Sequence, residues 1–536
     1  MNQHCNISYV KEGKNKTEAK TSKQPKEIQQ VSFVNATHEK HSVHYQTVKP
    51  IADSDDRKLL LHSATEAARL IRLQELSSAK LVQACIQHTK DVNDQLNAIV
   101  HINYTEALRE AKKADDYIRD LDKNSQEFKN LAETLPLLGV PFVSKDNLKT
   151  KNFITIAGHP KRVKNPPSEE DAEVIQRFQL ISETSTTHNF RFRQSGAILL
   201  AITNLPKNSQ LWETYNSGGS SGGTAALVAS MAVSIGIGND LGGSVRIPSF
   251  CCGIFGLKPT AGSVPLNGMV PEVTEPQMQQ LWTIGPICRY AEDLELVYKV
   301  MLRNEMTTKR LNFDGPFDMR NISIFYVKEL NDLLCEPLQA DVKESVKMAV
   351  KHFEDTYGLH AQPVEFEFAN HTFELFFANA TGDRLPDSYM TCLKRTINWL
   401  TNKNSDETPL TLILNLAKTI LIADRQTINF YRDKSKQLKD EVHRMLGQTG
   451  VLLYPAMATT APFHYQPNFT LFNIIYTTLF NVLGLPAISC PMGLNNHGLP
   501  LGIQVIGGPN SEPFLIAVAK EIEKAFGGWV PPRSTK

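Results

Sequence analysis

The chain has 536 residues, eight cysteines and a formal net charge of +1, from 57 basic and 56 acidic side chains. This balance gives no overall field that would draw the protein to nucleic acid or to an anionic membrane, so binding must arise at local sites. The cysteines lack the spacing of metal ligands and the density of a disulfide framework. We therefore expect free, mostly buried thiols, no metal and no cofactor.

Residues 1–50 are rich in Lys, Gln, Asn, Thr and Ser and poor in large apolar side chains. Such a segment cannot bury enough apolar surface to offset the entropy of ordering, so we expect a disordered polar tail. It contains no apolar run long enough for a signal peptide or a spanning helix. Residues 51–536 are expected to form one large domain in an intracellular protein, and membrane association is left open.

The ordered part begins with helical patterns. Apolar spacing typical of a helix starts after Ser63 and continues through residues 81–85, and a second helical stretch covers residues 104–121. Residues 135–141 then predict a short buried strand followed by a turn.

Strands and helices alternate in the next part of the chain. Residues 197–203 form a continuous apolar run that predicts a strand covered on both faces, and residues 233–238 have the same character. A helix of small residues is expected at 224–231, and another helix near 250–255. The order of these units predicts an α/β fold, a mixed β-sheet covered by α-helices.

Two glycine-rich loops carry serines at positions suited to hydrolysis. Ser220 lies in Gly-Gly-Ser-Ser-Gly-Gly at 218–223, and Ser244 lies 24 residues later in Gly-Gly-Ser-Val-Arg at 242–246. Amide hydrolysis needs a nucleophile, a proton relay and donors for the developing oxyanion. Ser244 suits the nucleophile, because it follows a strand and precedes a helix. The backbone N–H groups of Leu241, Gly242, Gly243 and Ser244 would form the oxyanion hole.

Lys145 completes the expected machinery. It follows the apolar residues 140–143, where burial can depress a lysine pKa enough for the amine to act as a base. Ser220 would then pass a proton between Lys145 and Ser244. Each piece alone has a commoner interpretation, a flexible glycine linker or a solvated Lys-Asp pair, but their combination favours catalysis.

At these residues the chain resembles the amidase signature family, in which a lysine, a serine and a nucleophilic serine form a triad. Lys145, Ser220 and Ser244 match the three positions, and the resemblance covers nearly everything beyond residue 55. Within the family it is most similar to the fatty-acid amide hydrolases. The resemblance implies hydrolysis of N-acyl amides to a carboxylic acid and an amine through an acyl-enzyme. Further matches lie at residues 213–216, 285–289, 481–487, 498–504 and 527–532.

Several alternatives stay open. Residues 179–194 have the pattern of an insertion, and the segment before Ser217 is shorter than in similar sequences, which would misplace Ser220. A catalytically impaired lipid-binding or scaffold protein with the same fold is therefore a second hypothesis, and an amidotransferase subunit acting on glutamine is a third. The apolar residues 410–422 could line an acyl channel, make a peripheral membrane contact or form a core helix. A homodimer is also left open.

Overall fold

The computed structural model describes residues 55–179, 195–205 and 216–532, apart from residues 314, 316, 328–334, 368, 383–384, 403–406, 408, 465 and 469. All of these belong to one unit of the chain, Thr47–Lys536. The predicted tail at 1–50 lies outside the described residues, as does nearly all of the predicted insertion at 179–194.

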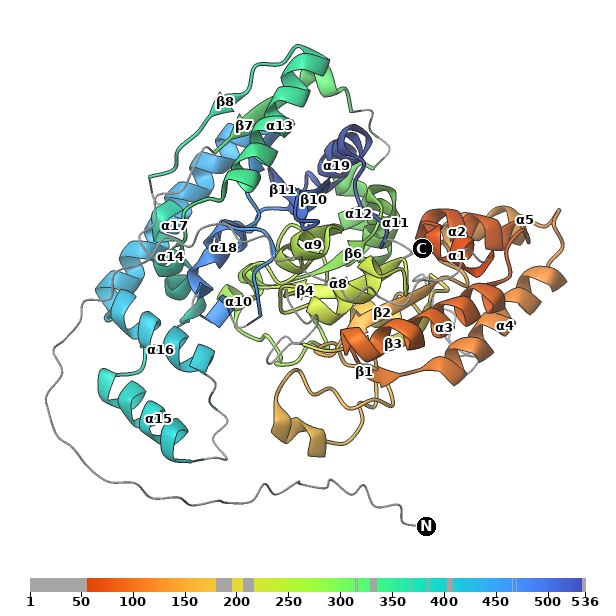
Figure 1. The fold of residues 1–536 in the computed structure, drawn as a ribbon, viewed down its shortest axis with the longest axis horizontal. Helices are drawn as coiled ribbons and strands as arrows, with labels where there is room; N and C mark the ends of the chain where they lie inside the picture. The colour runs from red at the N-terminus through yellow and green to blue at the C-terminus, as the bar shows by residue number, and fades with distance from the viewer. Residues whose placement is uncertain are drawn as a thin grey trace, which may run out of the picture. The chain divides into compact units, whose positions relative to one another are not determined.

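One mixed sheet of eleven strands forms the centre of this unit, in the order β1-β3-β2-β4-β6-β5-β10-β11-β9-β7-β8 (Figure 1). The pairs β2–β3, β2–β4, β7–β9 and β7–β8 are parallel, and the others are antiparallel. The predicted α/β class is thereby confirmed. The strands are β1 Ile99–Ile102, β2 Pro141–Lys145, β3 Ile198–Thr203, β4 Ile235–Asp240, β5 Phe255–Lys258, β6 Thr283–Cys288, β7 Ser323–Tyr326, β8 Gln362–Pro363, β9 Gly450–Tyr454, β10 Ala487–Leu494 and β11 Pro500–Gly507.

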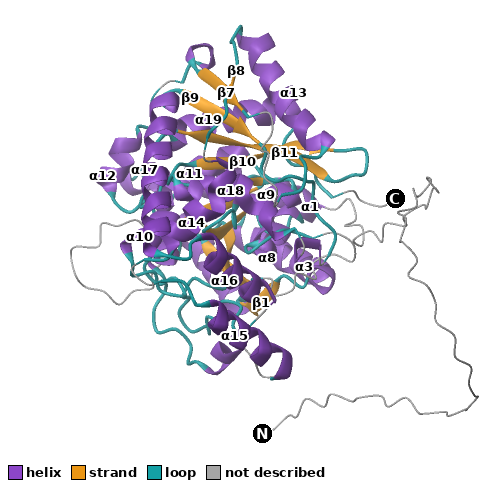
Figure 2. Cartoon of the chain, turned by 90° about the vertical axis from the view of Figure 1, so that its left-hand side faces the viewer, coloured by secondary structure: helices purple, strands orange, loops and turns teal. Residues whose placement is uncertain are grey.

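Helices lie on both sides of the sheet (Figures 1 and 2). For example, α19 packs on β10, α13 on β11, α11 on β6 and α8 on β4. The helices are α1 Asp55–Leu61, α2 Ala64–Arg72, α3 Ser78–Leu96, α4 Tyr104–Asp120, α5 Gln126–Lys129, α6 Leu131–Thr134, α7 Glu173–Gln176, α8 Gly222–Ala229, α9 Arg246–Cys252, α10 Pro276–Leu281, α11 Ala291–Met301, α12 Glu305–Leu311, α13 Ala340–Tyr357, α14 Thr372–Ala380, α15 Tyr389–Thr401, α16 Pro409–Leu421, α17 Arg425–Leu446, α18 Ile475–Val482 and α19 Glu512–Phe526.

The strands β2, β3 and β4 position the residues of the candidate site. All residues of these three strands are buried, which fits their apolar composition. Their parallel registers align Lys145 with Thr203, and Ser144 with Ile237. Because parallel strands end at the same edge of a sheet, the side chains at the ends of β2 and β4 are brought together there.

The predicted elements are partly confirmed. The strand at 197–203 and the helix at 104–121 agree with β3 and α4. The helical pattern after Ser63 is two helices, since α2 ends at Arg72 and Ser77 caps the start of α3. The strand predicted at 135–141 was wrong, because the strand begins only at Pro141, and Gly139 adopts a φ of +76° that an extended strand does not allow. The helix expected near 250–255 ends at Cys252.

The described cysteines agree with the expectation of free thiols. All seven are free, and five of them are buried. Among the described helices, none combines the length and the apolar character that crossing a bilayer requires.

Candidate active site

Lys145 occupies the last position of β2, where its side chain is fully buried. Its Nζ donates a hydrogen bond to Ser220 Oγ at 2.7 Å and a second one to the side-chain oxygen of Asn239, at the end of β4. Burial lowers the pKa of Lys145 to about 7, although the nearby charge of Asp240 opposes this shift. At neutral pH a large share of this amine is therefore uncharged.

Ser220 lies in the loop that leads into α8, and the Gly219–Ser220 peptide bond is cis. Packing requires a glycine at position 218 of this loop. Gly218 has a φ of +73°, and a Cβ added there would lie 2.9 Å from the Cα of Pro248. The interpretation of 218–223 as a flexible linker is thus wrong, because the loop packs against α9.

Ser244 lies in the connection between β4 and α9. The backbone N–H of Ser221, next to Ser220, donates to the carbonyl of Ser244 at 3.2 Å, so the two serine loops are in direct contact. Within the described part of the chain, no hydrogen bond joins the hydroxyls of Ser220 and Ser244. The structure thus brings Lys145 and Ser220 together directly and Ser244 beside them through the backbone.

The loop that carries Ser244 is wrapped around the carboxylate of Asp240. This carboxylate accepts the backbone N–H groups of Gly243 at 2.8 Å, Val245 at 3.1 Å and Arg246 at 3.4 Å. The N–H of Gly243 is therefore engaged in a hydrogen bond. Residues Leu241, Gly242 and Ser244 itself are partly exposed. Among the predicted oxyanion donors, Gly243 is the residue whose N–H already donates to Asp240.

A buried ion pair holds this arrangement in place. Arg246 contacts Asp240 through Nη2 at 3.0 Å and Nε at 3.2 Å, and both side chains are fully buried. Arg246 also donates to Asn481 and Gln504. Although burial by itself raises the pKa of Asp240, the Arg246 guanidinium more than compensates and holds this pKa well below its usual range. Asp240 is thus a fixed negative charge behind the loop.

Sequence reasoning missed the supporting residues Asn239, Asp240 and Asn481. The two polar residues Asn239 and Asp240 end an otherwise apolar strand, which is a signal for function at a strand end. Asn481 begins the family match at 481–487, but the sequence does not reveal its contact with Asp240, which joins residues 241 positions apart.

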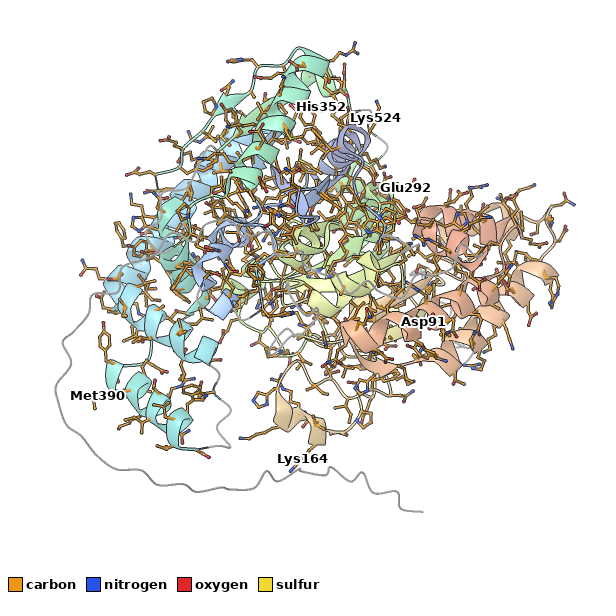
Figure 3. All side chains as sticks on the ribbon, viewed as in Figure 1. Asp91, Lys164, Glu292, His352, Met390 and Lys524 are labelled. Carbon is orange, nitrogen blue, oxygen red and sulfur yellow. The ribbon has the colours of Figure 1, made fainter. Side chains whose placement is uncertain are left out.

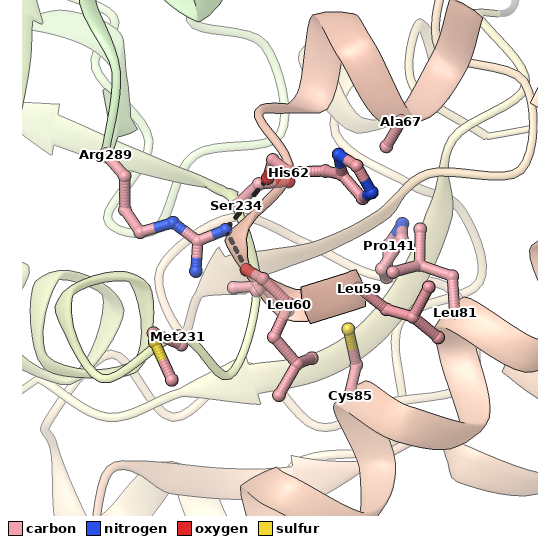
Figure 4. Close-up of a pocket in the computed structure, with 11 residues that line it drawn as sticks. Leu59, Leu60, His62, Ala67, Leu81, Cys85, Pro141, Met231, Ser234 and Arg289 are labelled. Atoms are coloured by element: carbon pink, nitrogen blue, oxygen red, sulfur yellow. Dashed lines mark hydrogen bonds between the residues drawn. The ribbon is translucent and has the colours of Figure 1, made fainter. Parts of the chain in front are cut away.

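A small pocket of about 10 Å³ lies elsewhere, beside Arg289 (Figure 4). It has room for about one water molecule, and none of the predicted catalytic residues lines it. Arg289 donates there to the backbone oxygens of Leu60 and His62. Among the described residues, no cluster of three or more His, Cys, Asp or Glu side chains could hold a metal ion.

Comparison with known proteins decides the family. The family model described as Amidase matches residues 80–516. The chain is 32% identical over 517 residues to fatty-acid amide hydrolase 2 of Homo sapiens, which covers 91% of this chain and 92% of that protein. The chain belongs to the amidase signature family. It is thus an amidase, a hydrolase of the same family as fatty-acid amide hydrolase 2.

Solved structures show the same fold at lower identity. A fatty acid amide hydrolase structure superposes with a TM-score of 0.66 at 20% identity, covering 88% of this chain and 86% of that one. A 6-aminohexanoate cyclic dimer hydrolase gives a TM-score of 0.68 at 20% identity, covering 88% and 99%. At this identity the likeness concerns the fold alone.

Proposed function

We propose that this amidase cleaves N-acyl amides, with fatty-acid amides as the substrate class, through a Ser-Ser-Lys triad and an acyl-enzyme. Lys145 is the base, Ser220 the proton relay and Ser244 the nucleophile. The observation that carries the proposal is the hydrogen bond between a fully buried Lys145 and Ser220, together with the burial that lowers the pKa of the amine to about 7.

The proposed acylation begins with two coupled proton transfers and ends when the amide C–N bond breaks. Neutral Lys145 takes the hydroxyl proton of Ser220, which takes that of Ser244 as Ser244 Oγ bonds to the amide carbon. The oxyanion is stabilised by the N–H groups of the 241–244 loop, with Leu241, Gly242 and Ser244 as donors and Gly243 sharing its hydrogen with Asp240. The proton returns through Ser220 to the leaving nitrogen. Water then hydrolyses the acyl-Ser244 ester by the same relay.

The shortened segment before Ser217 would weaken this proposal if it displaced Ser220. The segment lies outside the described residues, but Ser220 itself is within hydrogen-bond distance of Lys145. Asn216 also anchors the start of the loop, because its side-chain oxygen accepts the N–H of Gly218 at 2.8 Å. The geometry around Ser220 therefore supports an active enzyme over an impaired one.

An exposed apolar surface on α15 and α16 supports an acyl-chain substrate delivered from lipid. We call this surface the apolar helix pair. Its members on α15 follow helical spacing, and Met390 stands out from the helix in Figure 3. The exposed fractions are 62% for Met390, 51% for Leu393, 50% for Ile397, 69% for Leu400, 44% for Leu416 and 56% for Ile420.

Such a face exceeds what scattered surface residues explain, and it suits peripheral contact with a bilayer surface. Partly buried polar contacts link the two helices, since Thr419 of α16 donates to the carbonyl of Asp387 just before α15. Arg395 of α15 also pairs with Asp387 at 2.6 Å and with Glu407 at 2.7 Å. The pair is thus a preformed surface, and a second copy of the chain is the alternative occupant.

The proposed function is tested by labelling with a serine-directed fluorophosphonate and by hydrolysis of a fatty-acid amide. Wild type is expected to be labelled and to release fatty acid, and Ser244→Ala to lose both. The control Ser323→Ala changes an exposed serine at the start of β7 and should keep both. Persistent labelling of Ser244→Ala would exclude Ser244 as the nucleophile. Acyl-amide binding by wild type without turnover would favour the lipid-binding or scaffold protein instead.

A further inference from the structure

The helix α18 presents a polar face to the loop that carries Ser244. Thr477, Thr478 and Asn481 lie on this face, and each is at most 1% exposed. Buried hydroxyl and amide groups in an otherwise apolar helix require hydrogen-bond partners. The groups they bond to therefore indicate the role of this face. None of the expected triad residues lies on α18.

The hydroxyl of Thr477 holds the carbonyl of Gly242. Thr477 Oγ1 lies 2.7 Å from the Gly242 oxygen and 3.0 Å from the Ile474 oxygen. Thr478 Oγ1 has the reverse preference, at 2.9 Å from Ile474 and 3.1 Å from Gly242. Each hydroxyl has one hydrogen, so the distances assign the donor of Thr477 to Gly242 and that of Thr478 to Ile474.

The other end of the same peptide group is also fixed. The N–H of Gly243 donates to Asp240 Oδ1 at 2.8 Å, and this oxygen accepts the amide of Asn481 at 2.9 Å. In a trans peptide the carbonyl and the N–H point in opposite directions. The Gly242–Gly243 peptide is therefore held on one side by Thr477 and on the other by an aspartate that α18 itself positions.

The contact leaves no room for a larger residue. A Cβ built on Gly243 would lie 2.2 Å from Thr477 Oγ1 and 2.6 Å from the side chain of Ile247. Gly243 also has a φ of +122°, which other residues rarely adopt. The glycine at this position is thus explained by the approach of α18 as well as by the turn.

On the basis of the proposed amidase function, we propose that Thr477 is a positioning residue that fixes the oxyanion donors of the 241–244 loop. It touches neither Lys145 nor Ser220. By holding the Gly242–Gly243 peptide it sets the direction of the neighbouring N–H groups of Gly242 and Ser244. Because the oxyanion forms only in the transition state, loss of this control slows the reaction more than it weakens substrate binding.

Two variants at position 477 and one at position 478 test the inference. Thr477→Val removes the hydroxyl at nearly constant volume and is expected to lower kcat by roughly 10- to 100-fold, with KM changed less than about twofold, because directly removing an oxyanion donor costs about 10²–10³. Thr477→Ser keeps the hydroxyl and should stay within about threefold of wild type. The matched control Thr478→Val, whose hydroxyl serves Ile474, should have a smaller effect on kcat.

A tetrahedral mimic separates positioning from folding. An acyl trifluoromethyl ketone should bind Thr477→Val weaker by about the same factor as kcat/KM falls, whereas the fatty-acid product should bind unchanged. Equal kcat and equal ketone affinity in wild type and Thr477→Val would overturn the inference. It would also be overturned if Thr477→Ser lost as much kcat as the valine variant. Thr477→Ala provides the same comparison if the valine variant does not fold. A wild type that is neither labelled by fluorophosphonate nor active would instead contradict the proposed function itself.

Discussion

Lys145 shows how a lysine can be fully buried without a carboxylate in contact with its amine. A carboxylate in contact would hold the amine charged, but the two groups that contact its Nζ are a hydroxyl and an amide oxygen, those of Ser220 and Asn239. The charge of Asp240 opposes the shift, but Asp240 itself is paired with Arg246. The neutral partners allow burial to dominate and lower the pKa to about 7.

The first prediction concerns the pH dependence of catalysis. The base must be uncharged, so kcat/KM should rise as the pH increases through about 7, the pKa to which burial lowers Lys145. Asn239→Asp places a carboxylate against the amine, favours its charged form and should move this midpoint upward by about one pH unit or more. The measurement is kcat/KM for an acyl amide between about pH 6 and 10. An unchanged midpoint in Asn239→Asp would show that another group controls the profile.

The second prediction concerns the loss of the base. Lys145→Met keeps the volume of the apolar stem but removes the amine, and should lower kcat by roughly 10²- to 10⁴-fold, the usual contribution of general acid–base catalysis. Ser220→Ala should show a loss of similar order, because both residues act in the same relay. The double variant should then be little worse than either single one. If the loss of kcat in the double variant equalled the product of the two single losses, the two residues would act independently.

At the scale of elements, the β4–α9 connection depends on the charge behind it. Three backbone N–H groups of this connection converge on Asp240, whose charge is matched by Arg246. A short loop with two adjacent glycines would otherwise have many conformations. The buried Asp240–Arg246 pair thus fixes the conformation of this loop, which has few side chains of its own to pack.

The third prediction follows from this pair. Arg246→Met leaves Asp240 buried without its counter-charge, and should reduce the free energy of unfolding by about 3–5 kcal/mol. Combining it with Asp240→Asn removes the unpaired charge and should recover part of the loss. Urea unfolding of the three proteins gives the comparison. If Arg246→Met alone were as stable as wild type, Asp240 would not carry its charge in the fold.

The fourth prediction concerns the apolar helix pair. A double change of Ile397→Glu and Leu400→Glu places two charges on the exposed face of α15 and should greatly reduce co-sedimentation with phosphatidylcholine vesicles. Leu494→Glu, at the end of β10 and 41% exposed, is a matched control that should bind vesicles as wild type does. Unchanged vesicle binding combined with loss of a dimer in gel filtration would identify the surface as a contact between two copies of the chain.

For the molecule as a whole, sequence patterns identified the candidate catalytic residues more readily than the residues that support them. Lys145 and Ser220 follow from glycine loops and apolar runs that are local in sequence, and the structure brings them together. Thr477 acts on a glycine 235 positions away, a contact that depends on how α18 returns to the sheet. The strand misplaced at 135–141 has a local cause, because apolar residues before a proline fit a buried turn as well as a strand. The exposure of the apolar residues of α15 could also not be predicted from the sequence, because residues 389–401 have the mixture of apolar and polar residues that a half-buried helix would have.

The last prediction links the two buried lysines to the stability of the whole fold. Burial lowers the pKa of both Lys145 and Lys258 to about 7, from about 10.5 in an unfolded chain. Between about pH 7 and 8 the unfolded chain therefore binds protons that the folded chain has released, so stability rises with pH, by up to about 1.4 kcal/mol per pH unit for each lysine. The rise stops below about pH 7, where both states are protonated. It is opposed from about pH 8 upward, where unfolded thiols begin to ionise but buried ones such as Cys85, with a pKa raised to about 12, do not.

Urea unfolding at about pH 7, 7.5 and 8 measures this slope, and Lys258→Met should remove about half of it, because one of the two released protons is then absent in both states. The variant keeps Lys145, so the midpoint of its kcat/KM profile should remain near that of wild type. A slope of zero in the wild-type protein would mean that both amines stay charged in the fold. In that case the relay from Ser244 through Ser220 would have no base at neutral pH.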